Sequence, residues 1–245
     1  NTAIKSSRPA EAVTRWAVDG LVDLHRMSGH PRAAIEVLVE AARLPFDEDA
    51  RRTLRLRGAD IATVDLRDNA AAIDMYRAAL AAAPTDLEIM DRLGRALEAE
   101  DRVPEQLSLR QAQLGLERDG ERKLGLRLEI ARLVGLVEAR GGRLEALRAN
   151  LDERPGHEAS IDAVAHPLTD KGQHRALCEL LEEQAGRLEA AADGARAARL
   201  FGKSAQVAEV DLEDVDRAIS CHRRVVGLAP TTESLSALAR LNLGR

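Results

Sequence analysis

Aromatic side chains are scarce in this sequence. Only 2% of the 245 residues are aromatic, namely one Trp, one Tyr and two Phe. A compact globular core usually buries more large rings than this, because each ring removes a large apolar area from water. The hydrophobic fraction of 45% is instead mainly Ala, Leu, Val and Ile. Ala and Leu favour helices, and Ala lets helix backbones approach closely, so the composition indicates a thin, helix-rich array.

Cysteine is equally rare. The two cysteines, Cys178 and Cys221, lie outside any CxxC or Cys/His cluster, which excludes a disulfide scaffold. None of the six histidines stands four residues from another and HExxH is missing, so we expect no metal site and no cofactor. No apolar run approaches the ~20 residues that span a bilayer. We expect a cytoplasmic protein, with the periplasm or cell envelope as the alternative because the chain starts at Asn1 without Met.

The sequence also lacks an excess of basic charge. The net charge is −5, the pI is about 5.8, and the 31% of charged residues interleave both signs. This balance argues against nucleic acid as the main partner, because phosphate binding needs a net basic face. The carboxylate runs have the spacing of solvated helix faces, so we expect no catalytic pair and no enzyme. Arg51, Arg52, Arg55 and Arg57 are expected to pair with the nearby Asp47 and Asp49.

What the sequence does contain is an internal repeat. Residues 59–85 read ADIATVDLRDNAAAIDMYRAALAAAPT, and residues 205–231 read AQVAEVDLEDVDRAISCHRRVVGLAPT. The identities fall at the following positions of the first copy: Ala59, Ala62, Val64, Asp65, Leu66, Asp68, Ala72, Ile73, Arg77, Ala83, Pro84 and Thr85. Such self-similarity is typical of arrays in which each unit buries its apolar face on the next.

Each copy predicts the same local structure. A first helix is expected to end at Leu66 or Leu212, and Asp68 or Asp214 then stands where a side chain can cap the next helix. The second helix is expected to stop before Pro84 or Pro230, since proline cannot continue a helix interior. Thr85 and Thr231 are the expected caps of the helices that follow.

Weaker copies fill the rest of the chain. Turns are expected at residues 28–31, 101–104 and 170–172, and a final helix over residues 232–243. This spacing predicts about six helix pairs and a C-terminal capping helix. We expect residues 1–10 to be a lead-in segment and residues 11–245 to be one array. The segment Gly202-Lys203-Ser204 resembles the end of a phosphate-binding loop, but Ala197 stands where that loop needs Gly, so a turn of helix is expected there.

The motif residues resemble those of the tetratricopeptide repeat (TPR) family. Ala72, Tyr76, Ala79 and Pro84 match the small, aromatic, small and proline positions of its second helix, and Leu93-Gly94 matches the Leu-Gly pair of its first helix. The match is partial where Gln106, Arg118 and Arg143 replace motif residues. The first helices of the units at residues 59 and 205 lack the Leu-Gly pair and resemble the longer, divergent units of large bacterial TPR proteins. The resemblance implies an all-α, right-handed α-α superhelical solenoid, and the motif encodes packing only.

The resemblance further implies a concave groove, lined by first helices, that holds a peptide, a helix or a domain of a partner protein. By helical phase, the expected groove residues of the N-terminal units are Trp16, Asp19, Asp23, Arg26, Glu88, Asp91, Arg95 and Glu98. Trp16 is equally consistent with a core position and with a partner anchor. The chain lacks the Lys and Asn cluster of the subgroup that grips a C-terminal carboxylate, so we expect no such clamp.

Two other functions remain open from the sequence. One is a self-assembling structural element, for which the last helix offers Leu235, Leu238, Leu241 and Leu243 as an apolar end face. The other is a regulatory domain of a longer protein. The leading hypothesis is a protein-binding scaffold within a larger bacterial assembly.

Overall fold

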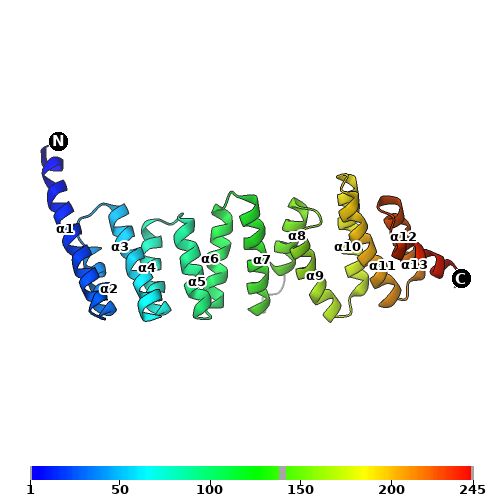
Figure 1. The fold of residues 1–245 in the computed structure, drawn as a ribbon, viewed down its shortest axis with the longest axis horizontal. Coiled ribbons are helices and arrows are strands. Elements are labelled where there is room, and N and C mark those ends of the chain that lie inside the picture. The colour runs from blue at the N-terminus through cyan, green and yellow to red at the C-terminus, as the bar shows by residue number, and fades with distance from the viewer. Residues whose placement is uncertain (1, 138–141, 244–245) are drawn as a thin grey trace. The chain divides into compact units, whose positions relative to one another are not determined.

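The computed structural model describes residues 2–137 and 142–243, with side chains from residue 11 to 137 and from 144 to 243. This part of the chain is helical and forms no strand (Figure 1). The elements are α1 (Thr2–Met27), α2 (Pro31–Ala41), α3 (Glu48–Ile61), the π-helical turn η1 (Ala62–Leu66), α4 (Asn69–Ala82), α5 (Leu87–Ala99), α6 (Val103–Leu116), α7 (Gly120–Leu136), α8 (Gly142–Glu153), α9 (Glu158–Asp170), α10 (His174–Ala190), α11 (Gly194–Val210), α12 (Val215–Leu228) and α13 (Thr232–Leu243).

These helices confirm the predicted count of six pairs and one final helix. The pairs run from α1 with α2 to α11 with α12, and α13 has the bounds that the sequence predicted. Residues 2–10, which the sequence predicts as a lead-in segment, are helical and belong to α1.

The chain divides into two compact units, which we call unit 1 (up to Leu126) and unit 2 (from Arg127). In unit 1, each helix from α1 to α6 packs on its neighbour in the sequence, and in unit 2 the same holds from α8 to α13. Contacts of this local kind are those of a repeat array, in which each element is stabilised by the next. A single superhelix over residues 11–245 stays a prediction.

Small residues build the cores of both units. In unit 1 the central cluster combines Ala59, Ala62, Ala72 and Ala79, all fully buried, with Leu and Ile side chains from α3 to α6. In unit 2 the corresponding cluster is centred on α10 and α11 around Phe201. Alanine at these crossings keeps the helix backbones close, which explains how the chain forms a core with so few rings.

The two copies of the internal repeat share one backbone geometry. Arg67 and Glu213 both adopt a left-handed conformation, with φ of 55° and 53°. The amide groups of Asp68 and Asp214 donate to the carbonyls of Ala62 and Ala208, both at 2.8 Å. The side chains of both aspartates cap the next helix at 3.0 Å, as predicted.

The predicted threonine cap of the helix that follows each copy is confirmed only in the second copy. Thr231 Oγ1 accepts from the Ser234 amide at 3.2 Å, so Thr231 caps α13. In the first copy Thr85 is displaced by Asp86, whose carboxylate accepts from the amides of Glu88 and Ile89. Aspartate is at least as good an N-cap as threonine and adds a negative charge at the helix N-terminus, which explains the shift by one residue.

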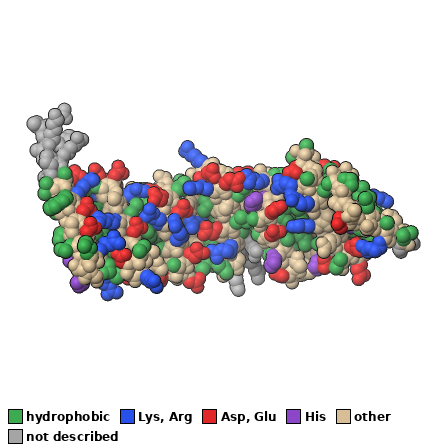
Figure 2. Space-filling view, in the orientation of Figure 1, with side chains coloured by type: hydrophobic (Ala, Val, Ile, Leu, Met, Phe, Trp, Pro, Cys, Tyr) green, Lys and Arg blue, Asp and Glu red, His purple; other side chains and the backbone are tan. Residues whose placement is uncertain are grey.

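The helices of the described ranges are amphipathic or mixed in character. None of them combines the length and the apolar content that crossing a bilayer requires. Figure 2 shows acidic and basic side chains interspersed over the face in view of each unit.

Candidate functional site

The first helices of unit 1, α1, α3 and α5, together with the turn η1, present a charged surface that we call the first-helix face. It consists of eight side chains, Asp19, Asp23, Arg26, Arg57, Asp60, Asp65, Arg92 and Arg95. Ion pairs join helices that are two elements apart in the sequence. The first-helix face is therefore organised by contacts across the repeats.

On the α1 side of this face, two arginines form ion pairs with the acidic side chains. Arg57 of α3 donates to Asp23 at 2.7 Å and also pairs with Asp19. Arg26 donates through Nε to Asp65 of η1 at 2.7 Å, and this hydrogen bond holds the pKa of Arg26 above its usual value. Asp19, Asp23 and Arg26 thus lie on the predicted face, but their charges are satisfied within the chain.

The predicted pairing of the α3 arginines with Asp47 and Asp49 was wrong. Arg51 and Arg55 both pair with Glu48, at 2.6 and 2.9 Å, while Arg52 pairs with Asp86 at the start of α5. Asp47 instead caps α3 by accepting from the Ala50 amide, and its second oxygen pairs with Arg15. A capping carboxylate points back at its own helix N-terminus, so it is not aimed at arginines along the helix.

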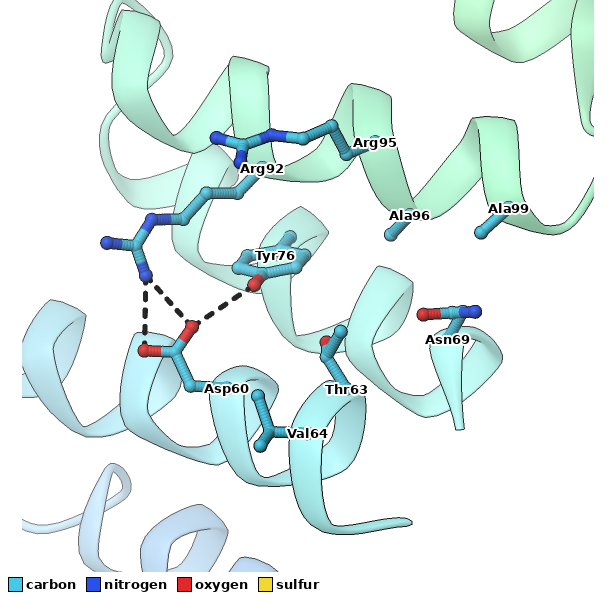
Figure 3. Close-up of a pocket in the computed structure, with 9 residues that line it drawn as sticks. All are labelled: Asp60, Thr63, Val64, Asn69, Tyr76, Arg92, Arg95, Ala96 and Ala99. Carbon is cyan, nitrogen blue, oxygen red and sulfur yellow. Dashed lines mark hydrogen bonds and ion pairs between the residues drawn. The ribbon is translucent and has the colours of Figure 1, made fainter. Parts of the chain in front are cut away.

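A cleft of about 410 Å³ opens between the α3–η1 segment and α5 (Figure 3). Its lining residues are Asp60, Thr63, Val64, Asn69, Tyr76, Arg92, Arg95, Ala96 and Ala99. The wall is partly apolar, because Val64 is 71% exposed and the Ala96 and Ala99 side chains offer only methyl groups. The Tyr76 ring, which the repeat motif contributes, lies at the base of the cleft (Figure 3).

Three side chains hold the cleft in shape. The Tyr76 hydroxyl donates to Asp60 Oδ1 at 3.3 Å, and Arg92 Nη1 lies 2.9 and 3.1 Å from the two oxygens of Asp60. Arg92 also donates to Glu88 at 2.7 Å. Burial of the ring and the negative charge of Asp60 both raise the pKa of Tyr76, so the phenol stays protonated at neutral pH and remains a donor.

Arg95 differs from the arginines around it. Arg95 lines the cleft, and its hydrogen bond is a long one of 3.4 Å from Nε to the Asp91 carbonyl. Every other arginine with a described side chain on α1, α3 and α5 has a carboxylate partner. The cleft therefore carries one cationic group that the described part of the chain does not neutralise.

The remaining predicted residues have different surroundings. Trp16 is 77% exposed, so in this structure it is not a core residue. Asp91 turns toward α6, where it accepts from Arg110 at 3.2 Å and from Gln113 at 2.7 Å. Glu98 is exposed on α5, and Glu88 is committed to Arg92. Their role in partner binding stays a prediction.

Sequence reasoning did not select Asp60, Asn69, Tyr76 or Arg92 as site residues. Tyr76 was interpreted as a packing residue of the repeat motif, which it also is, since it is 5% exposed. Asp60 and Arg92 lie 32 residues apart, which is close to one repeat length. An acidic and a basic residue at this spacing could have indicated an ion pair between the first helices of adjacent repeats.

Unit 2 contains a second polar cluster, which is half-buried between α10, α11 and α12. Glu182 accepts from Arg217 at 2.7 Å, from Ser204 at 2.8 Å and from the Cys221 thiol at 3.4 Å. Burial raises the pKa of Cys221 to about 12 and also raises that of Cys178. Thiols held protonated in this way are poor nucleophiles, which fits the predicted burial of Cys221. Gly202-Lys203-Ser204 lies inside α11, as predicted.

In the described ranges, no three His, Cys, Asp or Glu side chains lie close enough together to hold a metal ion. No protein-family profile matches the chain, and no curated protein sequence matches it.

The chain is similar to several solved TPR structures. One is a tetratricopeptide repeat protein from Parabacteroides merdae, with 13% identity, a TM-score of 0.48, and coverage of 93% of this chain and 99% of that one. YrrB, a TPR protein with an unusual peptide-binding site, has 14% identity, a TM-score of 0.43, and coverage of 85% and 100%. The C-terminal part of a TPR repeat-containing protein from Cytophaga hutchinsonii has 15% identity, a TM-score of 0.43, and coverage of 89% and 98%. All three TM-scores lie below 0.5, so the description of each unit as a tandem array of helices rests on the contacts that each helix makes with its neighbour in the sequence.

Proposed function

We propose that the chain is a protein-binding scaffold, and that the first-helix face of unit 1 receives a peptide, helix or domain of a partner protein. The observation that carries this proposal is the cleft between η1 and α5, because it combines a rigid polar frame with exposed apolar walls and a cation without a carboxylate partner. Recognition sites in proteins typically combine an apolar surface with a few fixed polar groups in this way.

The frame matters because a preformed site loses less entropy on binding. Asp60 is held by Arg92 and by Tyr76, and the ring of Tyr76 is itself packed in the core of unit 1. A partner segment therefore meets side chains whose rotamers are already fixed. The exposed methyl groups of Val64 and Ala99 supply apolar area that partner binding would remove from water.

The internal repeat provides a matched pair of variants for the test. Val64 in the cleft and Val210 in the second copy occupy the same repeat position and are 71% and 68% exposed. Val64→Glu places a charge in the cleft, while Val210→Glu makes the same change in unit 2. Neither change should alter stability by more than about 0.5 kcal/mol, because both sites are on the surface.

The measurement is quantitative capture of proteins from a lysate of the source organism by the purified chain and by each variant. The proposal expects a partner that the unmodified chain and Val210→Glu retain equally and that Val64→Glu loses. A partner retained by all three proteins would place binding elsewhere and contradict the proposal.

A second candidate function is self-assembly, which the surface of α1 favours. Val13, Trp16, Leu24 and Met27 are 65%, 77%, 59% and 88% exposed, and their spacing places them on one side of the helix. At the other end of the chain, Leu235 and Leu243 of α13 are 50% and 88% exposed, whereas Leu241 is buried. Light scattering over a concentration series, with Trp16→Ser and Leu24→Ser as variants, tests this candidate. A molecular mass that stays monomeric at all concentrations would exclude it.

A further inference from the structure

The unpaired charge in the cleft defines what the cleft can bind. Asp60 is the only carboxylate in the lining, and it is occupied by Arg92 and Tyr76. Arg95 has no carboxylate partner among the described residues, and its side chain extends from α5 in the same direction as Arg92 (Figure 3). Because Arg95 is exposed, its guanidinium can form a charge-assisted hydrogen bond with an incoming carboxylate.

The other end of the cleft carries an uncharged polar group. Asn69, the first residue of α4, lies toward the Ala99 end of the cleft in Figure 3. Its half-buried side-chain amide makes no hydrogen bond to any described residue. An amide offers two donors and one acceptor, which is the complement of a peptide group of an extended chain.

Between these two groups the wall is aliphatic and aromatic. Val64 on the η1 side and Ala99 on the α5 side are exposed, whereas Ala96 and the Tyr76 ring are each only 5% exposed. This arrangement suits an aliphatic side chain next to the charged one, since apolar contact there removes the methyl groups of Val64 from water.

Resting on the proposed scaffold function, we infer that the cleft binds an extended acidic segment of the partner protein. In this arrangement, a Glu or Asp side chain of the segment pairs with Arg95. A neighbouring aliphatic side chain packs on Val64, and a backbone peptide group bonds to Asn69. Arg92, the second guanidinium of the cleft, is already shared by Asp60 and Glu88, so Arg95 is the group left for the carboxylate.

The probe is a library of random peptides displayed with both ends fused, so that no peptide has a free carboxyl terminus. Selection is carried out on the unmodified chain, on Arg95→Gln and on Arg32→Gln. Arg32 is the matched control, because it is exposed on α2, has no ion pair among the described residues, and lies outside the cleft. Selected peptides are then resynthesised with both ends capped and titrated.

We expect Asp and Glu to be enriched at one position of the peptides selected on the unmodified chain and on Arg32→Gln. Arg95→Gln should lose this enrichment and weaken binding of the acidic peptides by about 10-fold, in line with one charge-assisted hydrogen bond. Asn69→Ala should weaken the same peptides by a few fold and leave the acidic preference unchanged. Raising the salt concentration should weaken binding to the unmodified chain more than binding to Arg95→Gln.

Two outcomes overturn the inference while leaving the scaffold function intact. One is a set of peptides whose binding is lost in Val64→Glu but that shows no acidic preference. The other is binding that appears only when the peptide carries a free carboxyl terminus. A library that yields no peptide sensitive to Val64→Glu overturns the scaffold proposal for this face and the inference with it.

Discussion

The guanidinium of Arg110 occupies the space that a side chain on Gly94 would fill. A Cβ added to Gly94 of α5 would lie 2.6 Å from Cζ and from Nη2 of Arg110 on α6. Arg110 is itself fixed, since Nη1 donates to Gln113 at 2.7 Å and to Asp91 at 3.2 Å. Glycine is therefore required at position 94 of the Leu93-Gly94 pair, because it leaves room for the buried Arg110 of α6 to pack against α5.

Gly94→Ala should destabilise unit 1 by about 1–2 kcal/mol, although Ala in a helix interior normally gains ~1 kcal/mol over Gly. The cost arises because the methyl group displaces Arg110 from its buried partners. Urea unfolding followed by circular dichroism measures the change. Gly20→Ala is the control, because no atom lies within 4 Å of a Cβ added at Gly20, and it should be neutral or stabilising. Equal destabilisation by both variants would contradict this account.

Substitutions at two glycines of unit 2 allow the free-energy cost of backbone strain to be compared with the added cost of a steric clash. Gly156 and Gly172 both have positive φ, at 71° and 64°, but only at Gly156 would an added Cβ meet another group, Leu188 Cδ1 at 2.5 Å. Gly172→Ala should cost ~1 kcal/mol from the left-handed backbone alone. Gly156→Ala should cost about 2–3 kcal/mol, because overpacking is added. Thermal unfolding of the two variants gives the comparison, and a Gly172→Ala variant that is the less stable of the two would refute it.

The Glu182 cluster should make unit 2 sensitive to acid. Burial alone would raise the pKa of Glu182, but the hydrogen bonds from Arg217 and Ser204 outweigh it, so the pKa lies below its usual value. A folded-state pKa below the unfolded one gives a stabilisation that is complete above the unfolded pKa and is lost as pH falls through the folded one. The loss should therefore begin below about pH 5. Glu182→Gln should flatten this part of the stability curve, and an unchanged slope in that variant would count against the cluster.

The two cysteines provide a probe of unit 2 by itself, because both lie in it. Their raised pKa values and their burial predict slow alkylation by iodoacetamide at pH 8 in the native protein. Reaction should occur only through opening of α10–α12, so destabilising unit 2 with Gly156→Ala should speed it by about 30-fold or more, whereas Gly94→Ala in unit 1 should not. Mass spectrometry of the labelled chain measures both rates. Rapid labelling of the unmodified chain would show that the cluster is open in solution.

Much of the fold could be predicted because its signals are local. Asp68 and Asp214 cap the helices that begin one residue later, and Pro84 and Pro230 follow the ends of the helices before them, so a few neighbouring residues determine each boundary. The shift from Thr85 to Asp86 shows the limit of such reasoning. Two capping residues stood side by side, and the sequence pattern alone did not choose between them.

The site was harder to predict because its contacts are not local. Arg57 was expected to pair with acids on its own helix, but it reaches Asp19 and Asp23 of α1, one first helix away. Such a pair depends on the phase and spacing of two helices that are separated by a third. Helical phase predicted groove residues on α1 and α5, Arg95 among them, but it could not show that Asp91 turns toward α6.

We propose that unit 1 binds a partner protein in the cleft between η1 and α5. This binding site can be located by hydrogen exchange of the chain with and without a captured partner, read by mass spectrometry. We expect slower exchange in the partner complex for the segments around residues 60–69 and 92–99, and no change at the equivalent repeat positions 206–215. Slower exchange confined to unit 2, or to the α2 and α4 side of unit 1, would contradict it.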